Sequence, residues 1–224
     1  MPIYHNLIIV MIVSIEGNIG SGKSTVLEIL REYFKDNKKV FFVDEPVSEW
    51  NNIKDGDKTI LELFYENKEK YSFSFQILAY ITRLRKLLEA IDDKSNEIII
   101  CERSIYTDKF VFAKMLYQQG YINEIEWQSY NYWFDTFKEK TNVDSIIYIN
   151  TEPSICFDRI KKRNRNGESS IPIEYLNHCH LLHQDWLHEN KKDNIIHFDG
   201  NIELGKDNQP EYINQLNVFM NSQC

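Results

Sequence analysis

The chain has 224 residues, of which 42% are hydrophobic, and a formal net charge of −8 at pH 7. This length and apolar content suit one α/β domain, and the acidic balance argues against a nucleic-acid-binding protein, which usually presents a basic face. No apolar run approaches the roughly 20 residues of a membrane-spanning helix, and the four cysteines have no paired spacing, so we expect reduced thiols in a cytoplasmic protein.

Short apolar runs alternate with longer helical patterns, which is typical of βαβ units and a parallel sheet. The expected strands are Leu7–Ile15, Val40–Val43, Ile98–Cys101, Ser145–Ile149 and Asn194–Phe198. The expected helices are Lys23–Lys35, Ser72–Ala90, Asp108–Gln118, Ile125–Lys140, Pro153–Arg163 with Thr151 as its cap, Pro172–Trp186, and a last one from Pro210. The pattern predicts an α/β fold with five parallel strands flanked by helices, and ligands beyond the C-terminal ends of the strands.

The first predicted strand runs into a glycine-rich loop with the pattern G-x-x-x-x-G-K-S. Glycines let successive backbone N–H groups face an anion, and the helix that follows directs its positive end to the same place. Lys23 adds a charge for the β- and γ-phosphates, and Ser24 offers a hydroxyl to Mg²⁺. The alternative, a plain turn between a strand and a helix, leaves Lys23 unexplained. We expect a nucleoside triphosphate here, bound by Gly17, Asn18, Gly20, Ser21, Gly22, Lys23, Ser24 and Thr25.

Charged residues follow the next two predicted strands. Glu45, stiffened by Pro46, is placed to act as a general base on a hydroxyl, although a lone glutamate is more commonly an N-cap or an exposed loop acid. Glu102 suits Mg²⁺, and Arg103 suits phosphate oxygens through its planar fork. The alternative for these two residues is a surface ion pair, which contributes little energy.

A basic segment interrupts the acidic chain between residues 159 and 168. Arg159 and Arg163 share a helix face, and a flexible basic lid would neutralise a triphosphate during phosphoryl transfer. The alternatives are a solvated helix end and a nucleic-acid patch. Four histidines near Cys179 raise the possibility of zinc, but the leucines among them indicate an amphipathic core helix and no second cysteine has a useful spacing.

Together these motifs resemble the deoxyribonucleoside kinase family, and within it the deoxycytidine and deoxyguanosine kinases. The resemblance extends from Ile12 to the C-terminal region. Its motifs are EGNIGSGKST at 16–25, EPVxxW at 45–50, YSFxFQ at 71–76, ERSxYxD at 102–108, RxxxRxR at 159–165 and IPxEYL at 171–176. The family implies a single P-loop kinase domain over residues 1–224, with a lid at about 159–171.

The resemblance implies transfer of the ATP γ-phosphoryl group to the 5′-hydroxyl of a deoxynucleoside, with ATP and Mg²⁺ as cofactors, in nucleotide salvage. Glu45 matches the general base and Arg103 the group on the 5′-oxygen and phosphate side. Ser24 and Glu102 match the magnesium ligands. The donor would also contact the lid residues Arg159, Arg163 and Arg165 and an adenine loop at 199–204 that contains Glu203, where Leu204 replaces an aromatic residue.

The acceptor site follows from the same resemblance. Its residues would be the base-reading Gln76, the apolar walls Trp50, Phe75 and Phe112, and the sugar-binding pair Tyr65 and Glu168. In the deoxycytidine and deoxyguanosine branch an Arg–Asp pair stands where Arg83 and Asp108 stand here, with a small residue at the position of Ala79. The pair would fill the space near a pyrimidine 5-methyl group, and removing one member would leave a buried charge. We therefore predict good turnover of deoxycytidine and purine deoxynucleosides, with a slight preference for deoxycytidine, and poor turnover of thymidine.

Two other functions remain as alternatives. A thymidylate-kinase-like nucleoside monophosphate kinase shares the loop and lid but needs a further cationic site for the acceptor phosphate. A nucleotide-binding switch would leave Glu45 without a role, and the chain has no D-x-x-G. The family also implies a homodimer formed through helices beside the sheet, for which residues 108–118 and 125–140 are candidates, although a helical core explains them equally well. The expected partner is a small-molecule deoxynucleoside, with no nucleic acid and no membrane.

Overall fold

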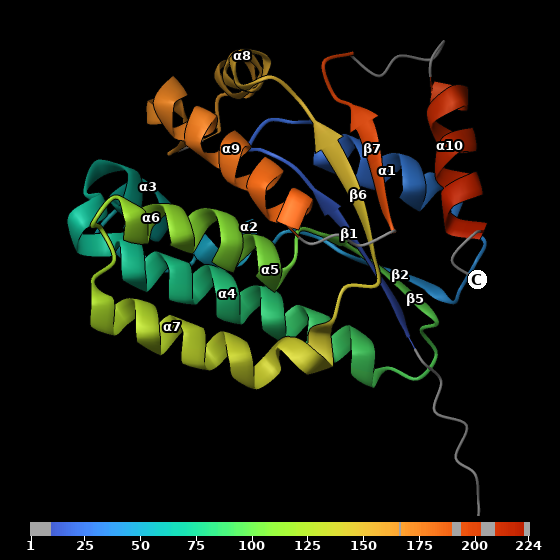
Figure 1. The fold of residues 1–224 in the computed structure, drawn as a ribbon, viewed down its shortest axis with the longest axis horizontal. Coiled ribbons are helices and arrows are strands. Elements are labelled where there is room, and N and C mark those ends of the chain that lie inside the picture. The colour runs from blue at the N-terminus through green and yellow to red at the C-terminus, as the bar shows by residue number, and fades with distance from the viewer. Residues whose placement is uncertain (1–9, 166, 190–193, 203–208, 222–224) are drawn as a thin grey trace, which may run out of the picture.

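The computed structural model describes residues 10–165, 167–189, 194–202 and 209–221. Its centre is a sheet of five parallel strands, as the sequence predicts, and their order is β2-β5-β1-β6-β7 (Figure 1). The strands are β1 (Met11–Glu16), β2 (Val40–Val43), β5 (Ile98–Glu102), β6 (Ser145–Asn150) and β7 (Ile195–Asp199). The first strand begins later than expected, because Met11 pairs with Ile98 at the start of β5; residues 1–9 lie outside the described part of the chain.

Helices cover both faces of the sheet. Six of the expected helices are present, most of them with shifted ends: α1 (Lys23–Tyr33), α4 (Lys68–Asp92), α7 (Glu124–Phe137), α8 (Pro153–Arg163), α9 (Ile173–Glu189) and α10 (Gln209–Asn221). Alternation along the strands divides the core: Val13 and Ile15 pack with α1 and α10, whereas Ile12 faces the larger cluster that contains α4, α7 and α9. The central strands β1, β5 and β6 are therefore buried on both sides, and ligands of such a sheet bind beyond the C-terminal ends of its strands.

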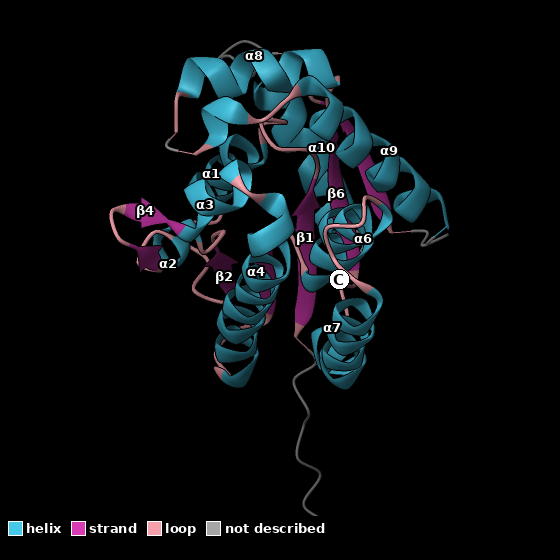
Figure 2. Cartoon of the chain, turned by 90° about the vertical axis from the view of Figure 1, so that its left-hand side faces the viewer, coloured by secondary structure: helices cyan, strands magenta, loops and turns pink. Residues whose placement is uncertain are grey.

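The sequence reading missed four short elements between β2 and α4. These are α2 (Val47–Trp50), the hairpin strands β3 (Lys54–Asp55) and β4 (Lys58–Thr59), and α3 (Ile60–Glu66). The hairpin projects from the side of the molecule next to α2 (Figure 2). A capping box starts α3, since the Glu62 N–H donates to the Thr59 hydroxyl at 3.3 Å and the Thr59 N–H donates to the Glu62 carboxylate at 2.8 Å.

The segment expected as one regular helix over 108–118 is irregular. It consists of α5 (Ile105–Thr107), a π-helical segment η1 (Asp108–Ala113) and α6 (Lys114–Gln118). A π-helical turn holds one residue more than an α-helical turn, so it changes which side chains share a face, and such turns often occur at functional sites. The following helix α7 ends at Phe137, and a 3₁₀ turn covers Lys138–Thr141.

The expected cap of α8 is wrong. The N-cap residue is Glu152, which makes no side-chain cap, while Thr151 donates its hydroxyl to the Ser21 carbonyl oxygen in the glycine-rich loop at 3.0 Å. Pro153 at the first helical position fixes the backbone without a cap. Among the helices of the described residues, none is both long and apolar enough to cross a bilayer.

Candidate active site

The glycine-rich loop joins β1 to α1 at the C-terminal edge of the sheet. A Cβ on Gly20 would lie 2.6 Å from the Cys156 carbonyl oxygen, so the loop passes α8 only because this residue has no side chain. Lys23 is buried and donates from Nζ to the Asn18 carbonyl oxygen at 2.7 Å. Burial lowers the pKa of Lys23 to about 8, and the Ser21 hydroxyl is buried without a partner among the described residues. An anion in the loop would satisfy both groups.

The two residues expected to hold Mg²⁺ lie together at the start of α1 and the end of β5. The Ser24 hydroxyl donates to the Glu102 carboxylate oxygens at 3.0 and 3.2 Å. Hydroxyl and carboxylate oxygens are the ligands that a hard divalent cation takes, usually with phosphate oxygens and water completing the shell. The donor set beside the loop therefore fits magnesium.

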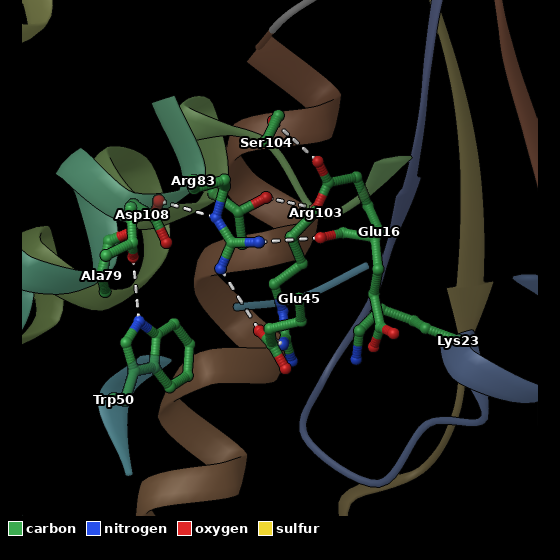
Figure 3. Close-up of polar contacts among 12 residues, drawn as sticks. Glu16, Lys23, Glu45, Trp50, Ala79, Arg83, Arg103, Ser104 and Asp108 are labelled. Carbon is green, nitrogen blue, oxygen red and sulfur yellow. Dashed lines mark hydrogen bonds and ion pairs between the residues drawn. The ribbon is translucent and has the colours of Figure 1, made fainter. Parts of the chain in front are cut away.

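Glu45 follows β2 and lies between two arginines (Figure 3). Arg83 donates from Nη2 to its carboxylate at 3.2 Å, and Arg103 makes a shorter ion pair with the same oxygen. Burial alone would raise the pKa of Glu45, but the charges of Arg103, Arg83 and Lys23 outweigh it and lower this pKa to about 2. Glu45 is therefore ionised, and Arg83 and Arg103 hold its carboxylate in place beside the cavity described below.

Arg83 uses its whole guanidinium fork to join three elements. From its place on α4 it donates from Nε to Asp108 at 2.9 Å, from Nη1 to the Glu102 carbonyl oxygen at 2.7 Å, and from Nη2 to Glu45. Arg83 is only 3% exposed. Burial raises the pKa of Asp108, while the neighbouring Arg83 charge acts in the opposite direction. The Arg–Asp pair inferred from the resemblance is thus present and buried.

Arg103 has an unusual backbone. Its φ is 63°, in the left-handed region that residues with a side chain rarely adopt. This conformation at the end of β5 turns the side chain toward Glu45, and Nη2 also donates to the Gly17 carbonyl oxygen at 3.3 Å. Strained residues of this kind cluster at ligand sites, where the surrounding contacts hold them.

These charged residues line part of a pocket of about 340 Å³, and apolar side chains line the rest. Trp50 meets Phe75 edge to face at 5.4 Å, and its indole N–H donates to the Thr82 hydroxyl at 3.0 Å. Gln76 is 2% exposed and lines the pocket, and its amide oxygen has no partner within the described residues. A buried amide that lacks a partner costs free energy unless a ligand supplies the missing hydrogen bond, so the pocket suits a flat, polar-edged molecule.

Most residues expected from the sequence line this pocket. They are Gly20, Gly22, Lys23, Ser24, Thr25, Glu45, Trp50, Tyr65, Phe75, Gln76, Ala79, Arg83, Glu102, Arg103, Asp108, Phe112, Arg159, Arg163, Arg165 and Glu168. Gly17, Asn18 and Ser21 do not line it, and Glu203 lies outside the described residues. The sequence reading missed Ile19, Val47, Leu61 and Tyr175. Three of these, Ile19, Val47 and Tyr175, stand inside the motifs given above, so only Leu61 on α3 lacked a signal.

Two arginines of the lid form ion pairs with a glutamate in the same segment. Arg163 and Arg165 both pair with Glu168, and the distance from Arg165 Nη1 to the carboxylate is 3.2 Å. Tyr65 lines the same pocket, and burial raises its pKa well above the usual range. Glu168 is thus placed to serve either the lid arginines or a ligand hydroxyl.

A second cavity of about 390 Å³ adjoins the glycine-rich loop and shares Gly22 and Arg159 with the first. Arg159, Gly200, Ile202 and Tyr212 line it together with Ser21 of the loop. Arg159 is fixed there by donating to the Gly200 carbonyl oxygen at 2.8 Å. This cavity lies where the adenine loop is expected, although residues 203–208 of that stretch are outside the description.

The histidine-rich stretch of α9 is part of the core. His183 is buried between the rings of Tyr148 and Trp186, and burial lowers its pKa to about 3. In the part of the chain that the structure describes, no three histidine, cysteine or acidic side chains are grouped so as to hold a metal ion.

Comparisons with known proteins agree with this geometry. The model of the family described as deoxynucleoside kinase matches residues 13–221. The chain is 36% identical to deoxycytidine kinases of Bos taurus over 205 residues and of Homo sapiens over 206, covering in each case 82% of this chain and 78% of the relative. It is 32% identical over 193 residues to a mitochondrial deoxyguanosine kinase of Xenopus laevis, covering 78% and 72%. The glycine-rich loop, the charged strand ends and the pocket between them are therefore parts of one known architecture, and the chain belongs to the deoxynucleoside kinase family.

Proposed function

We propose that this ATP-dependent deoxynucleoside kinase phosphorylates the 5′-hydroxyl of deoxycytidine and of purine deoxynucleosides in preference to that of thymidine. The observation that carries the proposal is the buried Arg83–Asp108 pair in the pocket that also contains the unpartnered Gln76 amide. Relatives named deoxycytidine and deoxyguanosine kinases support it. The thymidylate-kinase alternative is not favoured, because the matched family acts on nucleosides.

The size and charge of the pocket wall would discriminate against thymidine. A glutamine amide can turn over to pair with either cytosine or thymine, so Gln76 by itself does not separate the two bases. The Arg83–Asp108 pair occupies the pocket wall with ordered polar atoms, and a thymine 5-methyl group pressed against it would desolvate these charges without a compensating hydrogen bond. Ala79 keeps the neighbouring wall small, which leaves room for a purine.

The residues around the reacting hydroxyl have separate tasks. Glu45, ionised between Arg83 and Arg103, accepts the hydrogen bond of the 5′-hydroxyl and takes its proton as the new bond forms. Arg103 and Lys23 place positive charge next to the transferred phosphoryl group. The lid residues Arg163 and Arg165 give up their ion pairs with Glu168 and add their own positive charge at this group. Tyr65 and Glu168 then hold the sugar 3′-hydroxyl.

Magnesium and the donor base complete the proposal. Ser24 and Glu102 would hold Mg²⁺, which supplies neutralisation of the phosphate charge when it is bound. The donor base would enter the second cavity, between Arg159 and Tyr212. The planar guanidinium of Arg159 is held by the Gly200 carbonyl and is suited to stacking on a base.

The test is competition among nucleosides at equal concentration, with ATP and Mg²⁺ in excess. We expect kcat/KM for deoxycytidine to exceed that for thymidine by at least about 100-fold, the discrimination typical of an unmatched polar wall. Deoxyadenosine and deoxyguanosine should fall between them, and dCMP and dTMP should not be phosphorylated. Equal kcat/KM values for thymidine and deoxycytidine would refute the proposed preference.

The proposal extends to the domain organisation, the oligomeric state and the location of the protein. We infer that residues 1–224 act as one kinase domain with a lid at about 159–171, because both core clusters share one sheet. Homodimerisation through α7 is supported by its exposed apolar face. A cytoplasmic location is supported by three buried free cysteines, Cys101, Cys156 and Cys179, which a reducing compartment preserves.

A further inference from the structure

Thr151 lies directly after β6, is 1% exposed, and donates its hydroxyl to the Ser21 carbonyl oxygen of the glycine-rich loop at 3.0 Å. Arg159 donates to the same carbonyl at 3.3 Å. Two donors from the β6–α8 region therefore hold one carbonyl group of the loop on the side that faces away from the pocket centre, next to the second cavity.

The orientation of that carbonyl determines what the loop can bind. The peptide unit is planar and trans, so the Ser21 carbonyl and the Gly22 N–H point in opposite directions. Holding the carbonyl outward directs the N–H into the loop, toward the position of the donor phosphates. Backbone N–H groups aimed in this way are the main anion ligands of such loops.

Local sterics do not fix this peptide. Gly22 has φ of 102°, a left-handed conformation that glycine adopts as easily as its mirror image. The Ser21–Gly22 peptide could therefore turn over at little cost and present its oxygen to the phosphates, which would repel them. Hydrogen bonds from outside the loop are therefore needed to hold the Ser21–Gly22 peptide in the orientation that binds phosphate.

The packing around Thr151 leaves space for the hydroxyl that holds the Ser21 carbonyl. A Cβ on Gly200 would lie 1.9 Å from the Thr151 hydroxyl oxygen, so only glycine fits above it. The Gly200 N–H donates to the Asn150 carbonyl oxygen at 2.8 Å, which holds the backbone of Gly200 in that position. The residue after β7 thus packs on Thr151 while Thr151 holds the loop.

We propose that Thr151 is a positioning residue of the donor site, which orients the Gly22 N–H toward the donor phosphates through the Ser21 carbonyl. The proposal rests on the assignment of the glycine-rich loop as the donor site and adds a residue with no expected contact to either substrate. Thr151 acts through the loop, so its loss should affect the donor and spare the acceptor.

The decisive pair of variants is Thr151→Val, which keeps the shape and removes the donor, and Thr151→Ser, which keeps the hydroxyl. One hydrogen bond contributes about 0.5–1.5 kcal/mol, so we expect Thr151→Val to raise the KM for ATP about three- to tenfold. The KM for the best nucleoside should change by less than about twofold, and Thr151→Ser should behave like the wild type. Equal effects of Thr151→Val on both KM values, or no effect on either, would overturn the proposal.

Thermal unfolding with inorganic tripolyphosphate separates this proposal from the donor-site assignment. We expect tripolyphosphate to raise the melting temperature of the wild type and of Thr151→Ser, and to raise that of Thr151→Val clearly less. An unchanged rise in Thr151→Val would overturn the role of Thr151 alone, whereas no rise in the wild type would overturn the donor site as well. The methyl group of Gly200→Ala would displace the Thr151 hydroxyl, so this variant should also show a raised KM for ATP and a nearly unchanged KM for the nucleoside. If Gly200→Ala does not fold, the comparison of Thr151→Val with Thr151→Ser still tests the proposal.

Discussion

Glu45 is the proposed general base, and the proposed phosphoryl transfer depends on it. Its carboxylate contacts Arg83 and Arg103, and the net effect of burial and neighbouring charges is a pKa of about 2. Such a carboxylate is a weak base, which suits phosphoryl transfer because the transition state is loose and the hydroxyl proton needs to leave only late. Glu45 would then act twice, first by accepting the hydrogen bond that orients the hydroxyl and then by taking the proton late in the reaction.

Glu45→Gln should lower kcat/KM by at least about 100-fold, because the amide can no longer take the proton. Since the folded pKa of Glu45 lies near 2, the wild-type rate should show no loss attributable to this group between pH 8 and pH 5. The matched control is Glu49→Gln on α2, which loses the partly exposed ion pairs with Arg85 at 2.8 Å and Lys86 at 3.7 Å, and activity should change less than about twofold. Steady-state assays across this pH range measure both, and a fully active Glu45→Gln variant would remove Glu45 from the mechanism.

The positions of candidate site residues were predictable from sequence where these residues follow strand ends. Glu45 and Glu102–Arg103 could be placed together because the carboxyl ends of parallel strands meet at one edge of the sheet. Thr151 was misread as a helix cap because threonine is favoured at N-caps, although with Pro153 at the first helical position the cap position belongs to Glu152. Its actual partner is 130 residues away in sequence, and no local pattern reveals such a contact.

At the scale of elements, the Arg83–Asp108 pair joins α4 to the π-helical segment η1. Both side chains are buried, and Arg83 also contacts the end of β5 through the Glu102 carbonyl. A buried pair is weak evidence for stability, but removing one partner leaves an uncompensated charge. The pair therefore fixes how α4 lies against η1, and with it the wall of the acceptor pocket.

Arg83→Met should lower the free energy of unfolding by about 3–5 kcal/mol, because Asp108 is left buried without its cation. Adding Asp108→Asn should recover part of this loss, since the amide is neutral. The control is Arg85 and Glu89, an exposed pair at 3.6 Å on the same helix, for which Arg85→Met and Glu89→Gln should have small and additive effects. Denaturant unfolding measures all variants, and a double variant no more stable than Arg83→Met would contradict the paired-charge explanation.

A helix was recognisable from sequence where its hydrophobic period was long, although its exact ends were not always predicted. The helix α4 was recognised from its apolar spacing, although it begins four residues earlier than expected, at Lys68. The signal for α3 was present in the Thr59 and Glu62 capping box but was overlooked because the helix is short. The π-helical segment at 108–113 packs against α4 and α9, and we attribute its geometry to this packing. No residue pattern within the segment predicts the extra residue per turn.

At the scale of the molecule, α7 presents apolar side chains to solvent. Ile125 and Tyr132 are 72% and 77% exposed and lie seven residues apart on one face, with Trp133 beside them. The inner face of the same helix packs on α4, where Tyr80 meets Tyr130 at 5.5 Å. An exposed stripe on a helix that already belongs to the core is the surface we propose for the homodimer.

Sedimentation should show a dimer for the wild type at micromolar concentration. Tyr132→Lys should shift the protein to monomer by placing a charge in the apolar face, at a cost of a few kcal/mol of association free energy, on the order of 10²-fold in Kd. The control is Val218→Lys on α10, which is 65% exposed on the other face of the sheet and should leave the dimer intact. A monomeric wild type would show that this face has another use.

The sequence by itself determined the sheet, most helices, the phosphate loop and the charged strand ends, because these depend on local periodicity and on glycines and charges at fixed spacing. Tertiary structure alone decided the partners of those residues: Arg83 between Asp108 and Glu45, the lid arginines on Glu168, and Thr151 on the loop. Such contacts join residues far apart in the chain, and their geometry depends on how helices pack against the sheet. Local sequence preferences specify the elements, but only the packed core specifies the distances between their side chains.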